Sequence, residues 1–140
     1  MGIVNRTLDT TQQKKLIEVL IDDTITAREY PIYVVPHAQS LVDAKNACLG
    51  LSGAPTMTLK LSRFVAGAGL TTWTIGGALT VKALGTSGIQ TYSLPAAGDS
   101  LLALQKNDIV YAVAGGTNAA VSDNCVALVV QDLQDIVSWF

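Results

Sequence analysis

The chain has 140 residues, of which 49% are hydrophobic and 14% are charged, and its formal net charge is −2. This composition excludes intrinsic disorder, which requires low hydrophobicity and high charge, and the length predicts a single domain. The acidic balance lacks the basic excess of a nucleic-acid-binding protein, and no apolar run approaches the ~18 residues that span a bilayer. Because so few charges remain to keep a monomer in solution, we expect part of the surface to be buried against a partner.

Residues 1–29 differ from the rest of the chain, because they hold a single glycine and no proline. Four apolar side chains in this segment share one face of a predicted helix: Leu16, Ile17, Leu20 and Ile21. The same stretch also fits a period of two, so a strand straightened by an interface is the alternative. We predict an N-terminal arm or short helix over residues 1–29, whose four apolar side chains make assembly contacts.

From residue 30 onward the sequence predicts short strands joined by tight turns, because eleven of the twelve glycines lie between Gly50 and Gly116. The clearest strand is 56–64, where apolar and polar residues alternate and Phe64 falls on the polar side. The other predicted strands cover 30–35, 70–75, 78–84, 89–94, 101–104, 109–114 and 124–133. Gly76-Gly77 is interpreted as the turn of a hairpin. About eight strands at this spacing predict an all-β, jelly-roll-like antiparallel β-sandwich over residues 30–140.

No catalytic, metal or cofactor site is predicted. His37 is the only histidine, and no Gly-x-Ser-x-Gly elbow accompanies it, so we interpret it as a surface turn residue. Cys48 and Cys125 each lie in an apolar run, which favours two reduced, buried thiols over a disulfide. The acidic pairs Asp22–Asp23 and Asp132/Asp135 are interpreted as solvated turn or cap charges.

The aromatic residues allow two interpretations, a sugar-binding face or packing in the core and interfaces. The aromatic content of 6% favours packing. The residues concerned are Tyr30, Tyr33, Trp73, Tyr92, Tyr111 and Trp139. Trp139 and Phe140 place two large rings at the end of the sequence, and we predict that they dock onto this domain or onto a neighbouring copy.

Residues 86–111 show a distinctive order of elements. A strand is followed by the Pro/Gly loop 95–99, a short apolar run and a Lys106-Asn107-Asp108 turn into the next strand. Together with the opening strand 31–36 and the closing strand 124–133, this order resembles the small jelly-roll structural proteins of tailed bacteriophages. The resemblance covers roughly residues 30–135.

The resemblance implies a non-enzymatic virion protein of the capsid decoration (cement) type. Such a protein binds and stabilises the shell formed by the major capsid protein, commonly as a homotrimer. It implies a place on the capsid surface of the virion after synthesis in the host cytoplasm, and no cofactor, nucleic acid or membrane as partner. Other interpretations are a tail, neck or head-fibre subunit, a carbohydrate-binding jelly-roll module, or a small hydrolase that depends on His37.

The charges are also unevenly distributed along the chain. Residues 44–98 hold four bases and no acid, whereas residues 99–140 hold one base and five acids. This asymmetry suggests the hypothesis that copies meet head to tail through Lys60, Arg63 and Lys82.

Overall fold

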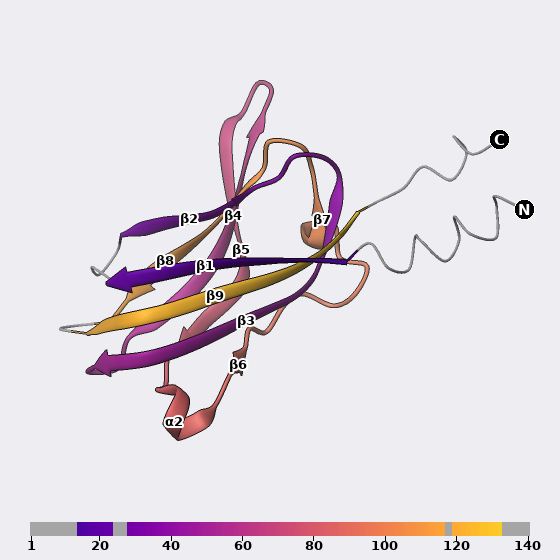
Figure 1. Cartoon of the computed structure of the whole chain (residues 1–140). Coiled ribbons are helices and arrows are strands. Elements are labelled where there is room, and N and C mark those ends of the chain that lie inside the picture. The colour runs from indigo at the N-terminus through magenta and orange to yellow at the C-terminus, as the bar shows by residue number, and fades with distance from the viewer. Residues whose placement is uncertain (1–13, 24–27, 117–118, 133–140) are drawn as a thin grey trace, which may run out of the picture.

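The chain folds into a sandwich of two antiparallel sheets, seen in a computed structural model that describes residues 14–23, 28–116 and 119–132 (Figure 1). The first sheet holds, in spatial order, β1 (Lys14–Asp23), β9 (Ala120–Asp132), β3 (Gln39–Ser52) and β6 (Gln90–Thr91), and β7 (Ala103–Leu104) also pairs with β3. The second sheet holds β2 (Glu29–Val34), β8 (Ile109–Gly115), β4 (Thr56–Val65) and β5 (Gly69–Thr80). Two short helical turns, α2 (Leu84–Ser87) and η1 (Ser100–Leu102), lie in the connections. None of the helices described is long and apolar enough to cross a membrane.

The strand pairings are nested in the manner of a jelly roll. β1 pairs with β9, β2 with β8, β3 with β6 and β7, and β4 with β5. The pairings β3–β9 and β4–β8 then join these hairpin-like pairs into the two sheets. This arrangement confirms the predicted all-β, jelly-roll-like antiparallel sandwich.

The core lies between the sheets and is built from the alternate, inward-facing residues of the strands. β4 follows the predicted alternation, since Met57, Leu59 and Leu61 are all fully buried. One polar pair also lies in this core. Asn46 on β3 and Asn124 on β9 are buried, and each side-chain amide nitrogen donates to the other's carbonyl oxygen at 2.9 Å. A slip of β3 against β9 would leave these amides unpaired, so the pair helps to fix the register.

The predicted N-terminal helix is wrong for the described residues, because Lys14–Asp23 form strand β1. β1 pairs with β9 along its whole length, from Lys14 opposite Gln131 to Asp23 opposite Ser122. Residues 14–23 therefore belong to the first sheet of the sandwich and do not form an arm outside it. The period of two, the alternative interpretation of this segment, is the one that the backbone adopts.

The hairpin predicted between 70–75 and 78–84 is also wrong, because β5 runs without interruption from Gly69 to Thr80. Gly76 is buried within this strand. A Cβ atom there would lie 3.1 Å from the Cβ of Leu59 and 3.2 Å from Cδ1 of Tyr92. The register of β4 against β5 shifts on both sides of Leu59, which Gly76 opposes. The glycine thus permits a close approach between strands and does not make a turn.

The two cysteines differ in their surroundings. Cys48 is fully buried in the core, as predicted, whereas Cys125 is only half-buried. Cys125 alternates with the buried residues Asn124 and Val126, so its side chain lies on the outer face of the first sheet. The prediction of two buried thiols is therefore correct for Cys48 only, and both cysteines are free.

Candidate functional site

Exposed apolar side chains are the most prominent chemical feature of the described surface. Twelve large hydrophobic residues are at least 37% exposed: Leu16, Leu20, Val34, Val42, Leu49, Leu51, Phe64, Val65, Leu70, Leu84, Ile89 and Ile109. They are concentrated on the outer faces of the two sheets and at the tip of one hairpin. Apolar surface gathered in this way is typical of binding surfaces.

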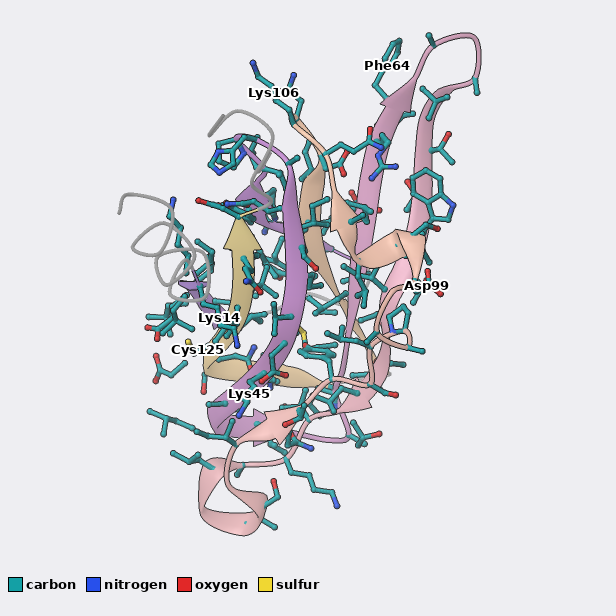
Figure 2. The ribbon with its side chains drawn as sticks, turned by 90° about the vertical axis from the view of Figure 1, so that its right-hand side faces the viewer. Lys14, Lys45, Phe64, Asp99, Lys106 and Cys125 are labelled. Atoms are coloured by element: carbon teal, nitrogen blue, oxygen red, sulfur yellow. The ribbon has the colours of Figure 1, made fainter. Side chains whose placement is uncertain are left out.

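The outer face of the first sheet carries an apolar row that crosses three strands. Leu20 on β1 lies opposite Cys125 on β9, which in turn lies opposite Ala47 on β3. A shallow hollow at this place is lined by Ala47, Ile89, Cys125 and Ala127, together with Glu18 and Lys45. Figure 2 labels Lys14, Cys125 and Lys45, which come from the same three neighbouring strands.

The thiol of Cys125 stays protonated at neutral pH. Burial raises its pKa, and the nearby carboxylate of Glu18 raises it further. Because the thiolate is the reactive form of cysteine, this raised pKa lowers the reactivity of Cys125.

The outer face of the second sheet holds a groove. Its lining includes Pro31 on β2, Leu70 and Thr72 on β5, and Ile109 and Tyr111 on β8. Ser62 and Thr72 also line it, and their hydroxyl oxygens lie 3.0 Å apart in a hydrogen bond. The groove therefore combines apolar side chains, two hydroxyl groups that already bind one another, and the acidic residue Glu29.

The hairpin of β4 and β5 projects beyond the body of the sandwich (Figure 1), and Phe64 near its tip points outward (Figure 2). Phe64 and Leu70 lie opposite each other and are 76% and 68% exposed. The loop between the strands, 66–68, contains only alanine and glycine, and Gly67 has a φ of 86° that suits this tight turn. The tip is thus apolar and carries no charged side chain.

The six predicted interface residues fall into three groups. Leu16 and Leu20 are 59% and 61% exposed, whereas Ile21 is buried and Ile17 packs against the core. The strand geometry separates them, because residues at odd and even positions point to opposite faces. Trp139 and Phe140 lie outside the described residues. The interface role of these residues remains a prediction.

Sequence reasoning missed Phe64, Leu70, Leu49 and Ile89 as surface apolar residues. For Phe64 a signal exists in the sequence, since it falls on the same side of the alternation as Thr58, Lys60 and Ser62. A large ring on the polar side of a half-buried strand predicts an exposed ring.

His37 belongs to a polar network at the end of β9. Its Nε2 lies 2.8 Å from Oδ1 of Asp132, and Nε2 of Gln39 donates to the same oxygen at 2.7 Å. The Tyr33 hydroxyl donates to the side-chain oxygen of Gln39, which is fully buried. The hydrogen bonds from Gln39 and His37 lower the pKa of Asp132, so its carboxylate is charged at neutral pH.

The hydrogen bonds of this network connect separate parts of the chain. Within residues 14–23, 28–116 and 119–132, no serine, threonine or cysteine side chain hydrogen-bonds to His37. The same residues contain no group of three or more histidine, cysteine, aspartate or glutamate side chains suited to a metal ion. His37 and Asp132 instead join the β2–β3 connection to the end of β9.

Of the aromatic side chains that suggested a sugar-binding face, Trp139 lies outside the described residues, and the others are buried or half-buried. Tyr92 and Tyr111 are buried, and the guanidinium of Arg63 lies 5.6 Å from the centre of the Trp73 ring. A sugar-binding platform needs an open ring face, which Trp73 does not offer on that side.

Arg63, one of the three bases named in the head-to-tail hypothesis, forms an ion pair within its own chain. Its Nε and Nη2 donate to the two carboxylate oxygens of Asp108 at 2.9 and 2.7 Å. Arg63 therefore neutralises an acid of its own chain. Lys60, the next base on β4, alternates with Leu59 and Leu61 and lies on the opposite face of the strand.

No protein-family model matches the chain, and no curated protein matches it. Among solved structures, it is similar to a chain described as "Structure of infectious bursal disease virus Gx strain", with a TM-score of 0.40 and 12% sequence identity. The similarity covers 88% of the present chain and 33% of that chain, so the present chain spans about a third of its length. The fold and surface together define the class of the protein as a jelly-roll β-sandwich with exposed apolar sheet faces.

Proposed function

We propose that the chain is a non-enzymatic structural subunit of a virion. In its specific form, the proposal is a capsid decoration (cement) protein of a tailed bacteriophage, bound to the outer surface of the major capsid protein shell. The order of elements over residues 86–111, which resembles jelly-roll phage structural proteins, supports this form and favours a homotrimer.

The exposed apolar surface carries the proposal. Leu20 and Leu49 lie exposed on the first sheet, Ile89 lies exposed directly before β6, and Phe64 and Leu70 lie exposed at the projecting hairpin. Leaving this much apolar surface in water is unfavourable, at roughly 25 cal/mol for each Å². In a subunit that stays bound to a protein lattice, the contact covers this apolar surface and removes it from water.

The architecture suits a clamp on a lattice. The chain termini of the described body, at Lys14 and Asp132, lie at one end of the first sheet, because Lys14 pairs with Gln131. The β4–β5 hairpin extends from another part of the sandwich (Figure 1). A rigid body with contact regions at separate places can touch more than one neighbour.

Binding to empty heads tests the proposal. Phage heads assembled without this chain are mixed with the purified protein and sedimented, at low and at high salt. We expect the protein to sediment with the heads at both salt concentrations, because apolar contacts are not screened. Failure to sediment with the heads, when phage tails or fibres do retain it, would favour the tail, neck or fibre interpretation.

A further inference from the structure

β1 lies at one edge of the first sheet. It is ten residues long and pairs on one side with β9. Among the described residues, no strand pairs with its other side. A long, open edge of this kind presents a row of backbone donors and acceptors to any extended partner, and proteins usually cover or block it.

The charges of β1 are arranged with opposite signs at its two ends. The strand begins with Lys14-Lys15, ends with Asp22-Asp23, and has Glu18 between them. Two such strands that run antiparallel bring the basic end of one beside the acidic end of the other. A parallel arrangement would place like charges together.

We propose that β1 pairs antiparallel with β1 of a second copy, across a two-fold axis that passes beside Glu18. This register places Leu16 of each copy opposite Leu20 of the other, on the outer face. It also places Ile17 opposite Val19 on the inner face, and Lys14 opposite Asp22. The two first sheets then form one continuous sheet.

The burial pattern selects this register. Leu16 and Leu20 are 59% and 61% exposed in the single chain, and the pairing covers both. A slip of one residue would place outer-face side chains opposite inner-face ones, because residues alternate between faces. A slip of two residues would place Leu16 opposite Glu18 or Asp22. The apolar contact between Leu16 of one copy and Leu20 of the other would then be lost.

Glu18 is the unfavourable member of the arrangement. The two copies of Glu18 lie opposite each other at the axis, and like charges in directly opposed positions are destabilising. Glu18→Gln is therefore expected to tighten the pairing.

The pairing through β1 is independent of the proposed function. A trimer held together by other contacts would use this pairing to bind a second trimer.

A disulfide at the axis tests the register. In a Cys125→Ser background, Glu18→Cys brings two thiols to directly opposed positions, and mild oxidation is expected to link most of the protein into covalent dimers. Leu49→Cys is the matched control, because Leu49 is 66% exposed on the same face but lies on β3. Absence of covalent dimers for Glu18→Cys, or equal linkage for both variants, would overturn the proposed register.

Sedimentation of the uncrosslinked protein tests the contact itself. Leu20→Lys is expected to weaken pairwise association by about tenfold or more, because the two-fold axis places the substituted residue in the contact twice, once from each copy. Leu49→Lys should leave association unchanged, and both variants should keep the circular dichroism spectrum of the unaltered chain, since both positions are exposed. Association that is missing in the unaltered chain, or equally sensitive to the two substitutions, would refute pairing through β1.

Discussion

Asp108 is buried at the end of the sandwich, where it accepts three hydrogen bonds. Two come from Arg63, and the third comes from the backbone N–H of Gln105 at 2.8 Å. Arg63 also donates to the carbonyl oxygen of Ala103 at 3.2 Å. The hydrogen bonds to Asp108 raise the pKa of the Arg63 guanidinium, so it is always charged. One ion pair thus ties β4 to the β7 region and to the turn that precedes β8.

Removing Arg63 is expected to destabilise the fold strongly. Arg63→Met leaves the carboxylate of Asp108, which is 1% exposed, without its charge partner. The loss should be about 3 kcal/mol in the free energy of unfolding, the usual scale for an uncompensated buried charge. Urea unfolding measures it. Lys60→Met, on the other face of the same strand, is the control. It should change the free energy of unfolding by less than about 0.5 kcal/mol. Equal effects of the two substitutions would contradict this role of the ion pair.

Single residues show where sequence reasoning succeeded and where it failed. The burial of Cys48 was predictable from its apolar neighbours, but Cys125 lies in a similar run and faces outward. The difference arises because the outer face of the first sheet is itself apolar, so hydrophobicity no longer distinguishes inside from outside there. The partners of Arg63 were not predictable, because 45 residues separate it from Asp108.

Among the elements, the β4–β5 hairpin is the most accessible candidate for contact with another protein. Phe64 and Leu70 are paired across its two strands, and neither belongs to the buried core. A hairpin that only connected two strands would have no physical need for two large exposed apolar side chains.

Substitution at the hairpin tip is expected to weaken binding to heads. Phe64→Ser removes the 76% exposed ring and should reduce the affinity for heads by about tenfold or more, because aromatic anchors dominate interface energies. The melting temperature should stay within a few degrees of its original value. Co-sedimentation measures the affinity, and Leu84→Ser in α2 is the control. Unchanged binding of Phe64→Ser would exclude the tip as a contact.

The strands were predictable to different extents. β4 alternates from Thr56 to Leu61, so both its existence and its buried residues Met57, Leu59 and Leu61 were predicted correctly. β1 was not, because Leu16, Ile17, Leu20 and Ile21 fit a helical face as well as an alternating one. Its conformation depends on pairing with β9, more than one hundred residues away along the chain, and no local pattern contains that contact.

At the scale of the whole molecule, the nested strand pairs explain the unusual composition. Some of the hydrophobic residues fill the core between the sheets, and others lie exposed on the outer faces. The shortage of charge that the sequence shows is therefore a property of the surface. Sequence reasoning predicted the fold class, but the positions of the apolar faces depend on which strands lie side by side.

The central claim is that this surface is covered by the shell of a virion. Cryo-electron microscopy of the phage particle to which we assign this chain tests it most directly. We predict density for the jelly-roll sandwich at regularly repeated positions on the outside of the capsid, with an apolar face or the β4–β5 hairpin against the major capsid protein. Particles in which the chain is missing from the shell, or lies only at the tail or fibres, would contradict the claim.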